Sequence, residues 1–457
     1  MTQLNCISPI DGSTYASRPL ATLEQAQEFV TRARNAQDAW AARPLNERIA
    51  LVRAGVAKIG ETTEQMALEL AHQMGRPVRY GGEFAGFEER ALYMADIAER
   101  TLAPIVIEDS SDFSRKIERE PQGVVFIVAP WNYPYMTAIN TLAPALIAGN
   151  TVILKHSTQT LLVGERLAEA FQAVGIPADV FQNIFLDHDT TGTLISQGSF
   201  NAINFTGSVG AGRTIERAAA GTFTAVSTEL GGKDPGYVME DANLDAAVDT
   251  LIDGAMFNSG QCCCGIERIY VHESLFDSFV EKAVALVSSY KLGNPLNQET
   301  TIGPMANIRF ANEVRAQTTE AIADGATAHI ATFAEDDGGT YLTPQILTNV
   351  NHNMRIMQDE SFGPVVGIMS VSSDEEAIQL MNDSEFGLTA SLWSADIDRS
   401  ETIAKQLQTG TVFMNRCDYL DPALCWTGCK NTGRGGGLSE IGYHNLTRPK
   451  SYHFKKK

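Results

Sequence analysis

Three consecutive cysteines, Cys262-Cys263-Cys264, follow a helical pattern and precede Gly265. A cysteine reacts as its thiolate, and nearby positive dipoles at a partly exposed position lower the thiol pKa enough to populate that form. The run therefore offers Cys263 as a candidate nucleophile. The alternative is that all three are small hydrophobic side chains in a buried turn, since free cysteine is often buried and inert. For the cysteines alone, burial is the favoured interpretation.

Two further residues could assist a nucleophile. Glu229 is expected at the end of a strand, before Gly231-Gly232, where a carboxylate could act as a general base. Asn132 lies in the loop Pro130-Trp-Asn-Tyr-Pro134, and because both prolines restrict the backbone its amide is held in place, as an oxyanion hole requires. The alternatives are a solvated strand-end glutamate and an Asx-type turn residue.

A glycine-rich turn, Phe205-Thr-Gly-Ser-Val-Gly-Ala-Gly-Arg213, follows an expected strand and opens a helix. Backbone N–H groups at such a helix start suit the diphosphate of a dinucleotide. The spacing differs from the usual G-x-G-x-x-G. A tight strand–helix turn that needs small residues is an equally good interpretation.

The elements that must position these residues alternate between short β-branched strands and amphipathic helices. Strands are expected at 124–128, 151–154, 202–205, 224–228, 268–271, 365–371 and 411–414. Helices are expected between them at 161–174, 244–257, 274–290, 307–324 and 374–383. This alternation predicts an α/β fold with parallel sheets covered on both faces, in two units that divide near Gly231-Gly232.

The two ends of the chain follow other patterns. Apolar residues recur at helical spacing in 23–36 and 46–61, and Thr22 with Gln25 forms a capping box, so the first hundred residues are expected to be helical. Segments 105–121 and 448–457 instead read as exposed strands with charged positions. Unpaired strand edges invite pairing, which favours an oligomer contact.

Composition excludes several classes of protein. The 457 residues are 44% hydrophobic and carry a net charge of −20, which disfavours nucleic acids and anionic membrane surfaces as partners. We expect no secretory signal, no membrane span and a cytoplasmic location. Seven cysteines, an odd number, fit neither a disulfide framework nor a paired Cys-x2-Cys zinc site, so no metal is expected.

Taken together, the motifs resemble those of the NAD(P)-dependent aldehyde dehydrogenases along essentially the whole chain. They are Pro130-Trp-Asn-Tyr-Pro134, Lys155, Phe205-Thr-Gly-Ser208, Glu229-Leu-Gly-Gly-Lys-Asp-Pro235, Gly260-Gln-Cys-Cys263, Glu360-Ser-Phe-Gly-Pro364 and Gly428-Cys-Lys430 followed by Gly433-Arg-Gly. Seven motifs in the family's order make coincidence negligible.

The resemblance implies a mechanism for aldehyde oxidation to a carboxylic acid. Cys263 attacks the aldehyde, and the Asn132 amide with the Cys263 backbone N–H holds the resulting oxyanion. Hydride passes to NAD or NADP, and water activated by Glu229 hydrolyses the thioester. The cofactor residues would be Trp131, Lys155, Ser157, Thr158, Gly207, Ser208, Glu360 and Phe362. Many NAD-preferring members carry a glutamate where this chain has Thr158, so NADP use is equally expected.

The resemblance also implies a substrate tunnel and a domain plan. The tunnel would be lined by Tyr133, Thr137, Asn140, Tyr419, Leu420 and Trp426, a set without arginine, which favours an uncharged or amine-bearing aldehyde. The plan is a Rossmann-like cofactor domain at 1–104 and 123–231, a catalytic domain at 232–435 and small oligomerisation strands at 105–122 and 436–457. A homodimer or homotetramer would follow.

Alternatives remain open. They are a semialdehyde dehydrogenase that prefers NADP and takes the distal carboxylate on Arg416, a thiol esterase that needs no cofactor, a CoA-acylating variant, and an inactive scaffold. Glu229 favours water over CoA as the acceptor, and the glycine-rich turn with Lys155 disfavours an esterase. Asp234 and the loop Cys425-Trp-Thr-Gly428 depart from the family pattern. A redox pairing among Cys262, Cys264 and the two cysteines at 425 and 429 is a further hypothesis.

Overall fold

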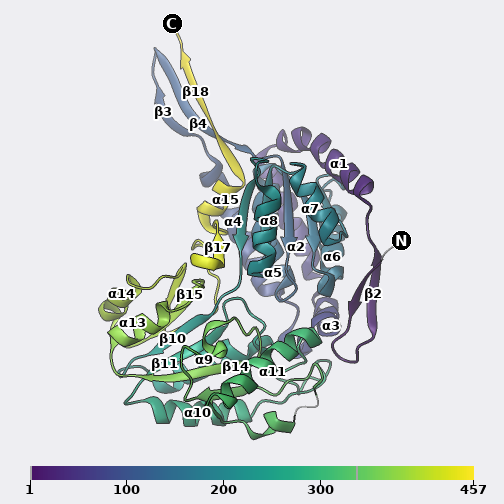
Figure 1. Ribbon diagram of the computed structural model, residues 1–457. Helices are drawn as coiled ribbons and strands as arrows, with labels where there is room; N and C mark the ends of the chain where they lie inside the picture. The colour runs from purple at the N-terminus through teal and green to yellow at the C-terminus, as the bar shows by residue number, and fades with distance from the viewer. Residues whose placement is uncertain (1–2, 336–337) are drawn as a thin grey trace.

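Two α/β units, one above the other in Figure 1, form the body of the computed structural model, which describes residues 3–335 and 338–457. The predicted α/β class is confirmed, and the chain passes from one unit to the other at Gly231-Gly232, between β9 and β10. No helix in the described ranges is both long and apolar enough to cross a membrane.

The upper unit contains a six-stranded sheet in the order β17-β9-β8-β5-β6-β7. Its strands are β5 (Val124–Ala129), β6 (Thr151–His156), β7 (Phe181–Asn183), β8 (Ala202–Thr206), β9 (Ala225–Glu229) and β17 (Gly433–Arg434). All neighbours are parallel except β17, which pairs antiparallel with β9. Every residue of β6 is buried, because helices cover both faces of this sheet.

Helices pack around that sheet and supply the largest core. They are α1 (Leu23–Ala41), α2 (Leu45–Gly60), α3 (Thr63–Met74), α4 (Phe84–Leu102), α5 (Pro134–Ala148), α6 (Leu161–Ala173), α7 (His188–Ser196) and α8 (Val209–Ala219), with short 3-10 turns at Val78–Tyr80 and Thr158–Thr160. The capping box predicted at Thr22 and Gln25 is present. Helix α5 is buried along nearly its whole length and packs on α4.

The lower unit contains a seven-stranded sheet in the order β12-β13-β14-β11-β10-β15-β16. Its strands are β10 (Asp234–Val238), β11 (Ile266–His272), β12 (Thr327–Ala328), β13 (Gln345–Thr348), β14 (Val365–Val371), β15 (Thr389–Trp393) and β16 (Thr411–Met414). Its helices are α9 (Leu244–Met256), α10 (Phe276–Ser288), α11 (Ile308–Ala323), α12 (Arg355–Gln358), α13 (Asp374–Asn382) and α14 (Ile397–Ala404), with 3-10 turns at Phe257–Gly260, Ala331–Glu335 and Lys430–Thr432.

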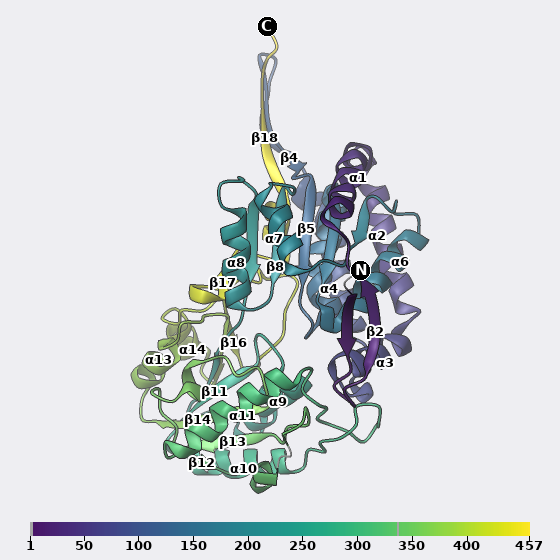
Figure 2. The ribbon, with the colours of Figure 1, turned by 45° about the vertical axis from the view of Figure 1, so that its right-hand side comes forward.

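The predicted exposed strands form a three-stranded sheet that projects from the body (Figures 1 and 2). Strand β4 (Phe113–Pro121) lies between β3 (Ile105–Asp109) and the C-terminal β18 (Thr447–Lys455), both antiparallel to it. The prediction that residues 436–457 are strands is wrong at its start. Helix α15 (Ser439–Asn445) forms there and contacts α4 and α5. Its buried Tyr443 donates a hydrogen bond to the Met94 carbonyl of α4.

The expectation of helices throughout the first hundred residues is also wrong at the N-terminus. Strands β1 (Gln3–Ile7) and β2 (Thr14–Pro19) form an antiparallel hairpin beside α3, seen in Figure 2. Distant residues hold it, since the Cys6 thiol donates to the Gln159 carbonyl at 3.1 Å and the Gln159 amide donates to the Ile7 carbonyl at 3.0 Å. A contact 152 residues away is invisible to local periodicity.

Candidate active site

A cavity of about 310 Å³ gathers residues from both units. Among its walls are the predicted nucleophile and base and the six predicted tunnel residues: Cys263, Glu229, Tyr133, Thr137, Asn140, Tyr419, Leu420 and Trp426. The tunnel residues come from the start of α5 and from the loop that follows β16. The tertiary structure therefore brings together a thiol, a carboxylate and an aromatic wall.

Cys263, the candidate nucleophile, lies just after a strained turn at the end of α9. Asn258, Ser259 and Gly260 all have positive φ (55°, 57° and 69°). Only glycine fits at position 260, because a Cβ there would lie 2.2 Å from the Gly363 carbonyl oxygen. The Gln261 side chain locks the turn by donating to the Asn258 carbonyl at 3.0 Å and accepting from the Ala306 amide at 2.8 Å. Strain held in this way is common at active sites.

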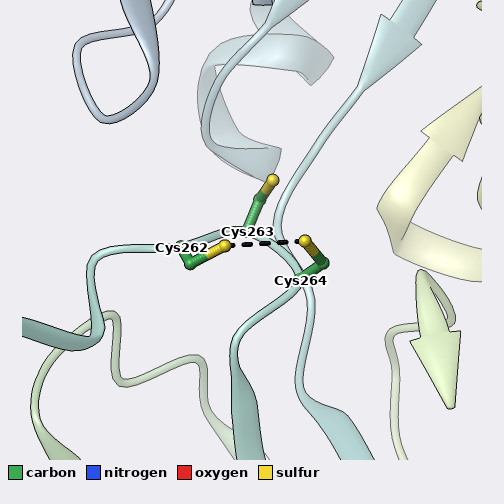
Figure 3. A group of neighbouring side chains, drawn as sticks. All are labelled: Cys262, Cys263 and Cys264. Atoms are coloured by element: carbon green, nitrogen blue, oxygen red, sulfur yellow. Dashed lines mark hydrogen bonds between the residues drawn. The ribbon is translucent and has the colours of Figure 1, made fainter. Parts of the chain in front are cut away.

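The three thiols lie together, with their sulfur atoms within 4.8 Å of one another. Figure 3 shows the Cys263 side chain pointing away from the other two, and Cys262 Sγ lies 3.5 Å from Cys264 Sγ. The proximity of the flanking thiols, Cys262 first, lowers the pKa of Cys263, whereas both of their own pKa values are raised. Cys263 is half-buried and its neighbours are buried. The reactive thiolate form is therefore favoured at Cys263.

Glu229 ends β9 and faces the same cavity. Burial raises the pKa of its carboxyl to about 7, partly offset by a hydrogen bond from the Thr206 hydroxyl at 3.4 Å and by the charge of Arg90. A general base works best when its pKa lies near the operating pH. The solvated strand-end interpretation is therefore wrong for this residue.

Asn132 is 4% exposed, on the loop between β5 and α5. The backbone carbonyl of Asn132 accepts hydrogen bonds from Arg76 Nη2 at 2.5 Å and from Asn258 Nδ2 at 3.4 Å. Arg76 forms a buried ion pair with Glu83, whose carboxylate also accepts the backbone N–H groups of Tyr135 and Met136, at 3.0 and 3.1 Å. These two charged residues anchor the Asn132 loop, and sequence reasoning missed both.

The glycine-rich turn opens α8, where Ser208 is the N-cap and accepts from the Ala211 amide. The Gly207 amide donates to the Glu229 carbonyl at 3.1 Å, so the turn lies beside the end of β9. Lys155, near the end of β6, is 7% exposed, and burial lowers its pKa. No described residue accepts a hydrogen bond from its ammonium. A buried cation without a partner fits a site for a ligand's hydroxyl or phosphate oxygens.

Lys155 is followed by a short 3-10 turn, Thr158–Thr160, that Ser157 caps by accepting from the Gln159 amide. Both Ser157 and Thr158 are half-buried and lie directly after β6. Their side chains are neutral, so this segment presents no carboxylate against a 2′-phosphate.

Glu360 lies where the two units meet at Gly231-Gly232. Its carboxylate accepts the Gly232 amide at 3.0 Å, and a Cβ on Gly231 would lie 2.4 Å from both carboxylate oxygens. Burial raises its pKa to about 8. The two glycines therefore admit this carboxylate against the backbone.

A buried clamp that sequence reasoning missed fixes the loop from Glu360 to Phe362. Glu267, on β11, accepts the backbone N–H groups of Ser361 and Phe362, each at 2.8 Å. Its other contact is the Lys233 ammonium at 2.6 Å, with side chains 0% and 5% exposed. Phe362, at φ 52°, then meets Trp131 edge to face at 5.5 Å, and Trp131 stacks on Phe310 at 5.1 Å.

Comparisons with known proteins agree on one family. The model of the aldehyde dehydrogenase family matches residues 1–452. An NADP(+) succinate-semialdehyde dehydrogenase of Deinococcus radiodurans is 30% identical over 97% of this chain and 93% of its own length. A betaine aldehyde dehydrogenase of Bacillus subtilis is 35% identical over 78% of this chain and 74% of its own. A solved structure of Staphylococcus aureus betaine aldehyde dehydrogenase with NAD+ superposes with a TM-score of 0.93 at 30% identity, covering 100% and 92% of the two chains.

The chain belongs to the aldehyde dehydrogenase family. It is therefore an NAD(P)-dependent oxidoreductase that converts an aldehyde to a carboxylic acid. The fold predicted from the resemblance is confirmed as well, since a putative aldehyde dehydrogenase from Burkholderia cenocepacia matches at a TM-score of 0.95 over 99% of this chain.

Two departures of this aldehyde dehydrogenase from the family pattern have structural explanations. Asp234 is 1% exposed, burial raises its pKa well above the usual range, and it accepts the Thr389 hydroxyl at 2.6 Å. This hydrogen bond joins β10 to β15. Trp426 is buried against the cavity and pairs through its backbone with Gly437, so the altered loop keeps its aromatic wall.

The arginine that reaches the cavity is not the one named from the sequence. Arg416 is exposed, with its guanidinium 3.5 Å from the centre of the Tyr419 ring. Arg90, from α4, lines the cavity instead. Two acids that sequence reasoning also passed over, Asp253 and Asp418, lie in the same wall.

Proposed function

We propose that Cys263 is the nucleophile of this aldehyde dehydrogenase and Glu229 its general base. The observation that carries the proposal is their position in one cavity, with a lowered pKa at Cys263 and a pKa of about 7 at Glu229. A thiolate beside a base that is half ionised near neutral pH suits both halves of the reaction.

The first half-reaction forms a bond between Cys263 Sγ and the aldehyde carbon, and the carbonyl oxygen becomes an alkoxide. The Asn132 amide and the Cys263 backbone N–H stabilise that charge. Support for Asn132 comes from its buried position and the hydrogen bonds to its carbonyl, which hold the residue in one orientation. A bound nicotinamide dinucleotide supplies one function, which is to accept the hydride that leaves the carbon.

The second half-reaction hydrolyses the Cys263 thioester. Glu229 removes a proton from water as the water oxygen attacks the carbonyl carbon, and the sulfur then leaves as a thiolate. Burial raises the pKa of the Glu229 carboxyl to about 7 and that of Asp418, in the same wall, to about 8. The product is a carboxylic acid, and Cys263 is restored.

We propose that the cofactor binds on the upper unit with its nicotinamide end against the loop before β14 of the lower unit, and that NADP is accepted as well as NAD. Gly207 and Ser208 would meet the diphosphate, Lys155, Ser157 and Thr158 the adenosine ribose, and Glu360, Phe362 and Trp131 the nicotinamide end. The support is the unpartnered ammonium of Lys155 beside the neutral Thr158. The Deinococcus radiodurans relative is named as an NADP(+) enzyme.

We further propose that 1–104 with 123–231 act as the cofactor domain, 232–435 as the catalytic domain, and β3, β4 and β18 as a contact in a homodimer or homotetramer. Support for the contact is the exposure of Ile105, Val106 and Ile107 on an edge strand. Seven free cysteines support a reducing, cytoplasmic location.

The test is reduction of NAD and NADP with a panel of aldehydes, followed by absorbance of the reduced cofactor. Cys263→Ala should lower turnover at least about 1000-fold. The matched control is Cys429→Ala, which should leave turnover unchanged. Cys429 is also half-buried, and its thiol donates to the Gln408 carbonyl. Cleavage of an aryl ester through Cys263 without any reduction of cofactor would instead assign a thiol hydrolase.

A further inference from the structure

Arg90 is a buried cation in the wall of the Cys263 cavity. It is 7% exposed and comes from α4, and its Nη1 donates to the Met136 carbonyl at 3.2 Å and to Asn140 Oδ1 at 3.4 Å. A guanidinium has five N–H donors on three nitrogens. Among the residues that the structure describes, none accepts a hydrogen bond from Arg90 Nε or Nη2. The edge of the guanidinium best suited to a bidentate acceptor is therefore open.

The side-chain amide N–H groups of the neighbouring Asn140 have no acceptor among the described residues. Asn140 is 3% exposed, its Nδ2 is buried, and within the described part of the chain its one side-chain hydrogen bond is the long bond that Oδ1 accepts from Arg90. Buried donors without acceptors are uncommon in native proteins and call for an explanation, such as a functional role or a bound water or ion. Two adjacent side chains with unused donors, both in the cavity wall, indicate that an acceptor enters from the cavity.

Arg90 forms no ion pair with a described residue, although Glu83 and Glu229 and the Cys263 and Cys264 thiols act on its charge at longer range. No described carboxylate lies within 4.0 Å of its guanidinium. The acids that face the cavity from other elements are Glu229 on β9, Asp253 on α9 and Asp418 on the loop after β16; burial raises all three pKa values, to about 7 for Glu229 and about 8 for Asp418. Glu89, one residue before Arg90, is exposed and accepts the Tyr419 hydroxyl at 2.6 Å. An arginine keeps its proton in such surroundings.

We propose that Arg90, supported by the Asn140 amide, binds a carboxylate carried by the aldehyde substrate. The substrate class is then a short semialdehyde, an acid with an aldehyde at its other end. A planar guanidinium edge matches a carboxylate in a bidentate arrangement, and the small volume of the cavity, about 310 Å³, limits the chain between the two groups. This inference rests on the proposed role of Cys263, toward which the aldehyde end points.

The alternative is that Arg90 has only a structural role, tying α4 to α5 through the Met136 carbonyl. The two roles differ in what a substitution does. Loss of a helix contact affects every substrate alike, whereas loss of a carboxylate partner affects only substrates that carry one. Arg90 also lowers the pKa of Glu229, and loss of that effect would change kcat/KM for all substrates by the same factor. The ratio of kcat/KM between a substrate with a carboxylate and one without therefore separates the two roles.

The experiment measures kcat/KM for 4-oxobutanoate and for butanal, which have the same number of carbons and differ in the carboxylate. The wild-type enzyme should prefer 4-oxobutanoate by at least about 100-fold. Arg90→Met should remove most of that preference, whatever change in kcat/KM both aldehydes share through Glu229, and Arg90→Lys should retain part of the preference. Arg100→Met, on the exposed face of the same helix (62% exposed side chain), is the matched control and should keep the preference.

Equal losses on both aldehydes in Arg90→Met would overturn the proposal, as would a wild-type enzyme without preference. A higher kcat/KM for glyceraldehyde 3-phosphate than for 4-oxobutanoate would overturn the assignment to a carboxylate. Calorimetric titration with glutarate, which needs no turnover, gives a second readout: binding to wild type should weaken at least about tenfold in Arg90→Met. If glutarate binds through Arg90 but no aldehyde reduces either cofactor, the proposed function fails and the anion site stands.

Discussion

Replacing Glu229 by Gln tests its raised pKa without relying on activity. An acid whose pKa is higher in the folded than in the unfolded protein binds its proton more tightly when folded. Its ionisation therefore destabilises the fold as the pH rises from the unfolded pKa of about 4.5 through the folded pKa of about 7. Glutamine has the same shape, accepts the Thr206 hydroxyl in the same way and does not ionise, so it removes this effect.

The size of the effect follows from the two pKa values. At pH 8 the wild-type carboxylate costs about 3 kcal/mol of folding free energy, and at pH 5 about 0.8 kcal/mol; residual water contact of this half-buried side chain makes both figures upper bounds. For a chain of 457 residues, about 3 kcal/mol corresponds to a rise in Tm of about 3 °C. Glu229→Gln should thus gain about 3 °C at pH 8 and about 1 °C at pH 5.

The assay is differential scanning calorimetry of both proteins at the two pH values and one scan rate. Glu216→Gln is the control, since Glu216 forms a surface ion pair with Arg434 and should show no gain that grows with pH. A Tm difference between wild type and Glu229→Gln that is the same at pH 5 and pH 8 would refute the reasoning. The wild-type kcat should also rise with pH through about 7 when thioester hydrolysis limits the rate, because the carboxylate is the active form.

Three further outcomes are expected. In Gly231→Ala the new Cβ would lie 2.4 Å from both Glu360 carboxylate oxygens and would displace that side chain. The KM for the cofactor should therefore rise at least about tenfold, while the rate of aryl-ester cleavage changes little. An unchanged KM would exclude Glu360 from the cofactor site. Glu267→Gln leaves the buried Lys233 ammonium without its carboxylate and should destabilise the protein by about 3–5 kcal/mol. The control is Glu320→Gln, at an exposed ion pair with Arg355, which should change stability by less than about 1 kcal/mol. Calorimetry of the two variants and the wild type measures both changes. Thr158→Glu should lower kcat/KM with NADP at least about tenfold relative to NAD, and an unchanged ratio would remove Thr158 from the ribose site.

Sequence reasoning succeeded where one local pattern determines one element. The capping box at Thr22 and the apolar strands at 124–128 and 151–154 follow from short-range preferences, and the structure confirms them. It failed at β10, because Pro235 and Gly236 are typical turn residues. In the structure Gly236 instead packs tightly in the strand, since a Cβ there would lie 2.7 Å from the end of the Leu251 side chain. Tertiary contact overrides local preference at such positions.

The sequence by itself determined the family, the reaction class and the candidate residues Cys263, Glu229 and Asn132, because motif types and their order are properties of the chain. Only the tertiary structure decided their environment. The pKa of Glu229 depends on desolvation by distant elements, the Glu267 clamp joins residues 94 and 95 positions apart, and Arg90 reaches the cavity from a helix more than 170 residues before Cys263. Burial and electrostatics depend on distance in space, which no local pattern records.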